Sequence, residues 1–209
     1  MEMICFDLEG VFVPEIWISV AQATGIDELR LTTRDVPNYD ELMAHRLQIL
    51  AAHDLRIGDI QRVIATLAPL PGAKAFLDWA RTNFAVAIIS DTFYDFAAPL
   101  MAQLGQPLLL AHSLEFSPQG HITGYKLRLP DQKRQAAIAF RALNFPVFAV
   151  GDSYNDVNML LEADHGFLFN PPAKVIEDYP QLPISTSYQD LAEKLIGVSS
   201  RPLTAYDHD

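Results

Sequence analysis

The stretch Met3-Ile4-Cys5-Phe6, followed at once by Asp7-Leu8-Glu9-Gly10-Val11, decides the fold class of this 209-residue chain. The four apolar residues are too few for a helix and are soon followed by a glycine, a pattern that predicts a buried strand. Because side chains alternate along a strand, Asp7 and Glu9 are expected to point to the same side. Two acids this close repel each other, so the pair implies a cation, a shared proton or a wider separation of the carboxylates. An acidic loop that caps the next helix is the alternative.

Composition excludes several kinds of partner. The net charge is −11 and the isoelectric point is about 4.8, which argues against nucleic acid and against anionic membrane surfaces, because both attract Lys and Arg. No stretch approaches the roughly 20 apolar residues of a membrane span, and the acidic start does not resemble a signal peptide. We therefore expect a soluble, cytoplasmic protein. The single cysteine, Cys5, is interpreted as a core residue, and the six scattered histidines as surface or loop residues.

Apolar runs alternate with helical patterns along most of the chain. After the first strand, further strands are expected at 86–90, 147–151 and 166–169, each apolar throughout, as in strands buried on both faces of a parallel sheet. Helical patterns separate them, at 72–83, 95–104, 131–143 and 156–163. This alternation predicts an α/β fold with a doubly wound parallel sheet.

One interval, residues 14–71, interrupts this alternation. Leu42, Leu47 and Leu50 form an apolar stripe at helical spacing. A second stripe of the same kind consists of Ile57, Ile60, Val63, Ile64 and Leu67. We predict a small helical insert that starts directly after the acidic pair and lies over it as a cap.

The remaining parts of the chain complete the predicted organisation. Residues 1–13 and 72–198 would form the core domain, and 14–71 the cap. Within the core, 108–129 contains a Ser-Pro-Gln-Gly turn signal and predicts a hairpin at the sheet edge. The tail, 199–209, shows no apolar face and is expected to be mobile.

Four polar motifs occur at the predicted strand ends or helix starts. They are Asp7-Leu8-Glu9, Ser90-Asp91-Thr92, Lys133, and Gly151-Asp152-Ser153-Tyr154-Asn155-Asp156. Three of the four follow a strand, at the carboxyl edge where open α/β sheets bind ligands. A helix cap at Ser90 or a surface charge at Lys133 would be ordinary taken singly. Four such motifs in this order are instead typical of a functional site.

Phosphoryl transfer is the chemistry that these residue types permit. An aspartate such as Asp7 can act as a nucleophile and carry an aspartyl-phosphate, while a neighbouring acid protonates the leaving oxygen. The transferring group is anionic and needs donors around its oxygens, which Ser90, Lys133 and Asn155 can supply. Carboxylates are hard oxygen ligands suited to Mg²⁺. The candidate ligands among them are Asp7, Asp152 and Asp156.

In this order the motifs resemble those of the haloacid dehalogenase superfamily of aspartate-nucleophile phosphatases. The resemblance implies a Rossmann-like core with a helical cap inserted after the first strand. It also implies that Mg²⁺ is held by the carboxylates of Asp7 and Asp152 and the backbone carbonyl of Glu9, with Glu9 as the acid. Asp156 would be an outer partner of the metal, and Asp91 is grouped with the phosphate-binding residues.

Two residues of the predicted cap extend the resemblance to substrate. Glu15 and Arg46 look like the glutamate and arginine with which phosphoserine phosphatases of this superfamily hold the serine ammonium and carboxylate. An amino acid needs one group of each sign, and arginine can hold a carboxylate through two parallel hydrogen bonds. An ordinary surface ion pair, which would contribute little, is the alternative.

Glu9 departs from the superfamily pattern, in which most members carry a second aspartate. Together with residues 14–17, 90–94 and 151–156, Glu9 makes the chain similar to one subgroup of the superfamily. Members of that subgroup combine phosphoserine phosphatase with phosphoserine–homoserine phosphotransferase activity. The implied substrates are phosphoserine and homoserine. Two rivals remain: a phosphatase of another small phosphomonoester, such as a nucleotide or sugar phosphate, and a catalytically silent binding module. The oligomeric state stays open, a homodimer included.

Overall fold

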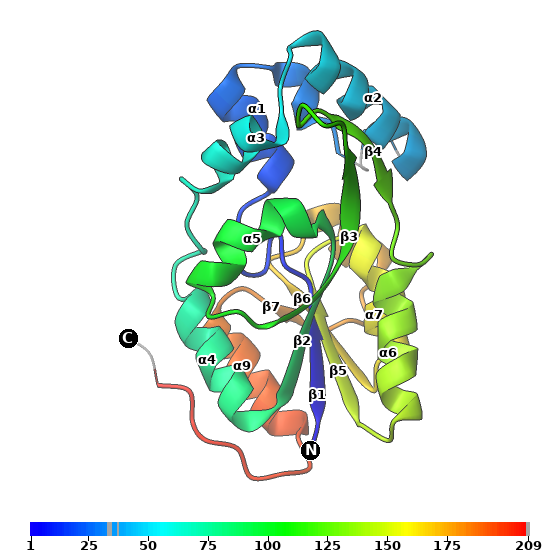
Figure 1. Cartoon of the computed structure of the whole chain (residues 1–209). Coiled ribbons are helices and arrows are strands. Elements are labelled where there is room, and N and C mark those ends of the chain that lie inside the picture. Colours follow the sequence, from blue (N-terminus) through cyan, green and yellow to red (C-terminus); the bar gives the residue numbers. More distant parts are fainter. Residues whose placement is uncertain (33–34, 37, 208–209) are drawn as a thin grey trace.

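The computed structural model describes residues 1–32, 35–36 and 38–207, and its centre is a twisted sheet with helices on both faces (Figure 1). Over these residues the strand order is β4-β3-β2-β1-β5-β6-β7, with β4 antiparallel to β3 and every other pair parallel. The predicted α/β class is therefore confirmed. The strands are β1 (Met3–Phe6), β2 (Ala85–Phe93), β3 (Leu108–Phe116), β4 (Ile122–Lys126), β5 (Val147–Gly151), β6 (His165–Phe169) and β7 (Ile184–Ser185).

Helices of the core form a layer on each face of this sheet. In Figure 1, α4 and α9 lie together on one side, and α6 and α7 lie together on the other. Each layer covers its own apolar cluster, which also takes in α5 on the first side and α8 on the second. These helices are α4 (Ala73–Asn83), α5 (Tyr94–Gln103), α6 (Gln132–Ala142), α7 (Val157–Glu162), α8 (Ala173–Asp178) and α9 (Tyr188–Val198).

The central strand β1 shows why the sheet is buried on both faces. Ile4 and Phe6 belong to the cluster under α4 and α9, whereas Met3 and Cys5 belong to the cluster under α6 and α7. All four side chains are buried. Alternation along the strand thus supplies an apolar side chain to each layer, and a fully buried Phe or Ile contributes about 1.5–3 kcal/mol. Cys5 is a core residue, as predicted.

A helical segment between β1 and α4 lies beyond the carboxyl edge of the sheet (Figure 1). Asn38 caps its longest helix, accepting hydrogen bonds from the backbone N–H groups of Asp40 and Glu41 at 3.0 and 3.2 Å. Leu42 and Leu50, from the predicted apolar stripe, are buried. The elements are α1 (Ile16–Thr24), η1 (Asp27–Arg30), α2 (Tyr39–Ala52) and α3 (Ile57–Ile64). The exact boundary between core and cap stays a prediction.

The hairpin of β3 and β4 lies at the sheet edge, as predicted, and it extends upward to the cap (Figure 1). At its turn, Gly120 accepts a hydrogen bond from the backbone N–H of Ile57 at 3.0 Å. Beside it, His121 Nε2 lies 2.7 Å from Asp54 Oδ1. The cap therefore touches the core at the hairpin as well as at its two chain connections.

The tail from residue 199 differs from the sequence-based expectation. Up to residue 207 it lies along α4, where the indole N–H of Trp79 donates to the Thr204 carbonyl at 2.9 Å. The Tyr206 ring is 5 % exposed and packs edge-on against Phe76 at 5.7 Å. The expectation of a mobile tail was wrong for this part, because isolated aromatic residues found partners on a helix distant in sequence. Residues 208 and 209 lie outside the described part.

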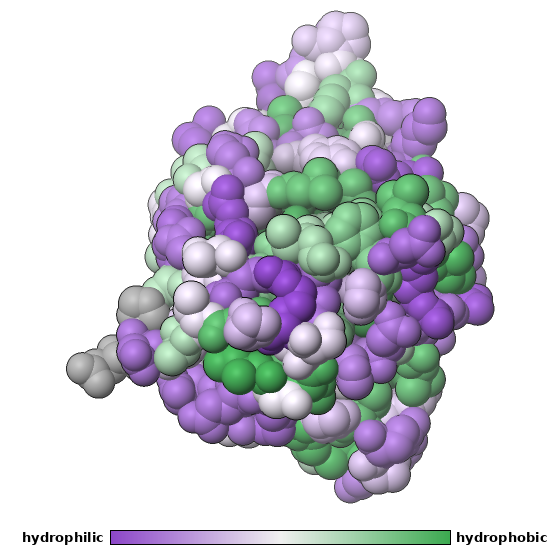
Figure 2. Space-filling view, turned by 90° about the horizontal axis from the view of Figure 1, so that it is seen from below, coloured by the Kyte–Doolittle hydropathy of each residue, from purple (hydrophilic) through white to green (hydrophobic). Residues whose placement is uncertain are grey.

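The end of the molecule opposite the cap mixes hydrophilic and hydrophobic surface residues (Figure 2). Small apolar patches there lie between hydrophilic ones. Within the described ranges, the chain contains no helix both long and apolar enough to cross a bilayer.

Candidate active site

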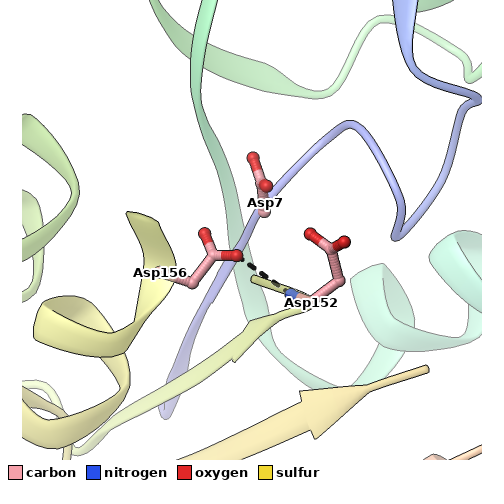
Figure 3. A group of neighbouring side chains, drawn as sticks. All are labelled: Asp7, Asp152 and Asp156. Carbon is pink, nitrogen blue, oxygen red and sulfur yellow. Dashed lines mark hydrogen bonds between the residues drawn. The ribbon is translucent and has the colours of Figure 1, made fainter. Parts of the chain in front are cut away.

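Three aspartates converge at the carboxyl edge of the sheet, as Figure 3 shows. Asp7 directly follows β1, Asp152 directly follows β5, and Asp156 lies one turn further on, in the short 3₁₀ helix η2 (Tyr154–Asp156). One carboxylate oxygen from each lies within 4.8 Å of the other two. The reason is the sheet itself: β1 and β5 are parallel neighbours, so the residues that follow them emerge side by side.

Two glycines make this close approach sterically possible. A Cβ on Gly10 would lie 2.6 Å from the Asp152 carboxylate, and the backbone there has a positive φ of 78°. A Cβ on Gly151 would lie 2.3 Å from the side chain of Asp156. Both distances are shorter than real Cβ contacts, so any larger residue would displace one of the three acids.

Lys133 joins the aspartates from the first turn of α6. Its Nζ lies 2.7 Å from Asp156 Oδ1 and 3.0 Å from Asp7 Oδ1, and its side chain is only 3 % exposed. Burial alone would lower the pKa of Lys133, but the charges of Asp156, Asp7 and Asp91 outweigh it and raise the pKa above its usual value. The ammonium therefore stays charged, and its removal would leave buried carboxylates unpaired.

The site holds more negative than positive charge. Burial, followed by the charge of Asp156, raises the pKa of Asp7 well above its usual range, although Lys133 opposes the shift. Hard oxygen donors with excess negative charge fit a divalent cation such as Mg²⁺. Asp156 is already engaged, because Oδ2 accepts from the N–H groups of Asp152 and Ser153 at 2.9 and 3.0 Å while Oδ1 contacts Lys133. Asp156 is thus the weakest of the three candidates for a direct ligand.

The Asp7 carboxylate presents its two oxygens differently. Oδ1 accepts the Leu8 N–H at 2.7 Å and faces Lys133, whereas Oδ2 makes no hydrogen bond to any described residue. A carboxylate nucleophile needs one oxygen that is held in place by hydrogen bonds and a second oxygen that is free to attack.

The predicted phosphate donors lie around the aspartates. Ser90 is buried, and its Oγ accepts the Thr92 N–H at 3.3 Å, which leaves the hydroxyl hydrogen free to donate elsewhere. Asn155 Nδ2 donates to Asp91 Oδ2 at 3.2 Å. The hydroxyl, amide and ammonium groups of Ser90, Asn155 and Lys133 therefore come from β2, η2 and the first turn of α6, and β2 continues to Phe93, past its predicted end at residue 90.

Glu9 connects this cluster to the cap. Its Oε2 accepts the backbone N–H of Ile16, the first residue of α1, at 2.8 Å. Burial and the neighbouring charge of Glu15 raise the pKa of Glu9 to about 8, although the Ile16 hydrogen bond and Arg46 oppose the shift. A carboxyl group that keeps its proton near neutrality can act as a general acid.

Arg46 reaches toward the same place from α2. Its guanidinium stacks on Trp17, 4.4 Å from the ring centre, and Nη2 donates to the Leu31 carbonyl at 2.8 Å. The side chain is 6 % exposed, so it is not the surface residue of the alternative interpretation. Nε is buried and has no hydrogen-bond partner among the described residues. No ion pair joins Arg46 to Glu15, both of which the structure describes.

Two hollows meet at this site. A small cavity of about 100 Å³ contains the predicted catalytic and cap residues, and a larger one of about 960 Å³ opens beside it. Four residues line both: Tyr39, Asp91, Ser153 and Asn155. The small cavity is lined by Asp7, Glu9, Glu15, Arg46, Ser90 and Asp152 among others. The structure thus brings the predicted residues to one pocket, apart from Lys133 and Asp156, which pack around it.

Sequence reasoning missed His112 and Gln132. His112 is only 4 % exposed, so its interpretation as a surface or loop residue was wrong. It lies on β3, which continues the parallel sheet before it turns into the hairpin. The apolar run 108–111 before it was a signal of a buried strand. Gln132 showed no such signal beyond its position next to Lys133.

Comparisons with known proteins identify the family of this chain. Residues 1–164 match the model of the haloacid dehalogenase-like hydrolase family. A Pseudomonas aeruginosa protein named phosphoserine phosphatase ThrH is 55 % identical over 98 % of this chain and 100 % of its own length. A phosphoserine phosphatase of Pseudomonas syringae pv. tomato is 52 % identical over 97 % of this chain and 86 % of its own length. The chain therefore belongs to the haloacid dehalogenase-like hydrolase family.

A solved structure shares the fold at lower identity. It is described as the phospho-aspartyl intermediate analogue of phosphoserine phosphatase. Its TM-score is 0.76 at 21 % identity, covering 95 % of this chain and 99 % of the other. The shared architecture includes both the sheet and the cap, because so little of either chain is left uncovered.

Proposed function

We propose that this chain is a Mg²⁺-dependent phosphatase of O-phosphoserine that can also transfer the phosphoryl group to homoserine. Family membership supports the phosphatase class, and the names of the two Pseudomonas relatives support phosphoserine as substrate. The observation that carries the substrate is the buried Arg46, whose Nε lacks a partner among the described residues and which lines the cavity that also contains Asp7. A ligand carboxylate would satisfy that donor.

In the first half-reaction Asp7 attacks the phosphorus of phosphoserine through Oδ2. A bond forms between this oxygen and phosphorus while the bond from phosphorus to the serine oxygen breaks. Glu9 gives its proton to that departing oxygen, so serine leaves as a neutral alcohol. When bound by Asp7, Asp152 and the Glu9 carbonyl, Mg²⁺ would offset the charge of the phosphoryl oxygens.

The second half-reaction reverses these roles. The Glu9 carboxylate takes a proton from water or from the homoserine hydroxyl, whose oxygen then bonds to phosphorus as the Asp7–phosphorus bond breaks. Ser90, Lys133 and Asn155 hold the phosphoryl oxygens in both halves. The products are inorganic phosphate or homoserine phosphate, and Glu9 regains its proton.

Recognition of the amino acid falls to the cap. Arg46 would bind the carboxylate of phosphoserine, and Glu15 its ammonium group. Homoserine carries the same two groups on a chain longer by one methylene, a difference that such pockets discriminate only weakly. One cavity could then serve the donor and the acceptor in turn.

An assay of both products tests the proposal. Enzyme, Mg²⁺ and phosphoserine should release inorganic phosphate, and added homoserine should divert part of it to homoserine phosphate. Removal of Mg²⁺ with a chelator should abolish both products, and its return should restore them. Release of phosphate alone would remove the transferase half. Preference for a nucleotide or sugar phosphate over phosphoserine would contradict the substrate, and no turnover of any phosphomonoester would favour the silent binding module.

A further inference from the structure

Asp91 is the residue of the site whose task the mechanism leaves unexplained. It follows Ser90 on β2, and its carboxylate borders both cavities. Burial alone would raise its pKa, but Lys133 and hydrogen bonds from His112, Gln132 and Asn155 hold the pKa well below the usual range. An ionised carboxylate repels a phosphoryl group, so direct binding of phosphate, as grouped by sequence, does not suit it.

The two oxygens of Asp91 face different partners. Oδ1 accepts from Gln132 Nε2 at 3.2 Å and lies 3.6 Å from His112 Nε2. Oδ2 accepts from Asn155 Nδ2 at 3.2 Å and lies 3.7 Å from Lys133 Nζ. One oxygen is thus held by supporting side chains, and the other faces two of the three proposed phosphate donors.

The supporting side chains are themselves fixed. Gln132 Nε2 also donates to the Ser90 carbonyl at 2.7 Å, and the Gln132 side chain is 4 % exposed. His112 Nδ1 accepts the backbone N–H of Arg128 at 3.2 Å, which places the ring proton on Nε2, the atom that faces Asp91. Asp91 is therefore held from the β3–β4 hairpin and from the start of α6.

We propose that Asp91 is a positioning residue that, held by Gln132 and His112, aims the Lys133 ammonium and the Asn155 amide at the phosphoryl group. Its negative charge also attracts the Lys133 ammonium, which Asp156 and Asp7 attract as well. The inference rests on the proposed phosphatase function but not on the choice of amino acid, because the phosphoryl group is common to all phosphomonoesters.

Asp91→Asn tests the role with little change of shape. The amide has one accepting and one donating end. In either orientation its NH₂ group therefore faces other donors, either those of Gln132 and His112 or those of Lys133 and Asn155. We expect kcat to fall about 10- to 100-fold on phosphoserine and on an aryl phosphate alike. Competitive inhibition by inorganic phosphate should weaken in parallel, a change that a merely structural role would not produce. Asp40→Asn, on the wall of the same large cavity, is the matched control and should behave like wild type.

A double-mutant cycle shows whether Asp91 acts through its partners. Asn155 is exposed, so Asn155→Ala should fold, and its loss of kcat combined with Asp91→Asn should be smaller than the product of the single losses. Multiplicative losses, or an Asp91→Asn enzyme with wild-type kcat, would overturn the inference. If Asp91→Asn fails to fold, Gln132→Met should lower kcat several-fold, and an unchanged kcat there overturns it equally. A wild-type protein inactive on both substrates would instead contradict the proposed function.

Discussion

The core side and the cap side of the small cavity differ in how far the protein pairs its charged side chains. On the core side, Lys133 contacts three carboxylates, and both oxygens of Asp156 have protein partners. On the cap side, the buried Nε of Arg46 has no partner among the described residues. Leaving a buried donor unpaired costs about 1–3 kcal/mol.

Under the proposed function, this difference assigns catalysis to the core side and substrate recognition to the cap side. The core cluster is held rigid by its own contacts, as preorganised catalysis requires, because the dipoles need not rearrange during the reaction. The cap instead keeps an incomplete hydrogen-bonding shell that a substrate carboxylate would complete. The core should therefore act on any phosphomonoester that fits, while the cap decides which one binds well.

The largest expected effect follows from a substitution that disables the core side alone. Asp7→Asn removes the proposed nucleophile, and we expect kcat to fall by at least about 10³-fold on every phosphomonoester. The melting temperature should change little, because the amide keeps the volume and one buried like charge is lost. Asp78→Asn, on the exposed face of α4, is the control. Near-normal turnover by Asp7→Asn would show that another group attacks phosphorus.

A substitution in the cap should impair recognition of the substrate and leave the core side unchanged. Arg46→Lys keeps the charge but loses the planar fork, so we expect kcat/KM for phosphoserine to fall about 10- to 100-fold. An aryl phosphate without a carboxylate should lose less than about threefold, since the core is unchanged. The loss of stacking on Trp17 makes a melting curve necessary alongside the kinetics. Arg62→Lys, on the exposed surface of the cap, serves as control. Equal losses on both substrates would end the assignment of Arg46 to recognition.

The smallest expected effect lies far from both sides, where Glu2 anchors the tail. Its carboxylate accepts from Ser199 Oγ at 2.7 Å and from Ser200 N and Oγ at 2.9 and 3.0 Å. Burial alone would raise the pKa of Glu2, but these hydrogen bonds, with the charge of Arg201, lower it below the usual value. The contribution to stability is thus present above the unfolded-state pKa and is lost as pH falls through the folded-state pKa.

Glu2→Gln should therefore lower the free energy of unfolding by about 1 kcal/mol at pH 7, with kcat unchanged. The deficit should shrink as denaturant unfolding is repeated at pH values falling through and below 4.5, the ordinary pKa of a glutamate side chain. The exposed Glu28→Gln should show no such dependence. A deficit that stays constant down to strongly acidic pH would mean that the Glu2 charge is not what holds the tail.

The sequence predicted best those features that are encoded locally. The first strand and the runs at 147–151 and 166–169 were recognisable because each is continuously apolar and all are strands of the sheet. The hairpin carried its own turn signal. The tail was misjudged, because Tyr206 and Thr204 find partners on α4, more than a hundred residues earlier, and no local pattern reports such a contact.

The motifs alone were enough to indicate phosphoryl-transfer chemistry, because Asp7 and Asp152 directly follow parallel strands and Lys133 lies in the first turn of a helix. Parallel strands bring their carboxyl ends to the same edge of a sheet. Which hydrogen-bond donors already have partners became visible only in the folded molecule. The pairing of Lys133 with Asp156, the Arg46 Nε left unpartnered among the described residues and the orientation of Asp91 all depend on side chains from separate elements. Their distances are set by packing across the whole molecule, and motif spacing carries no information about them.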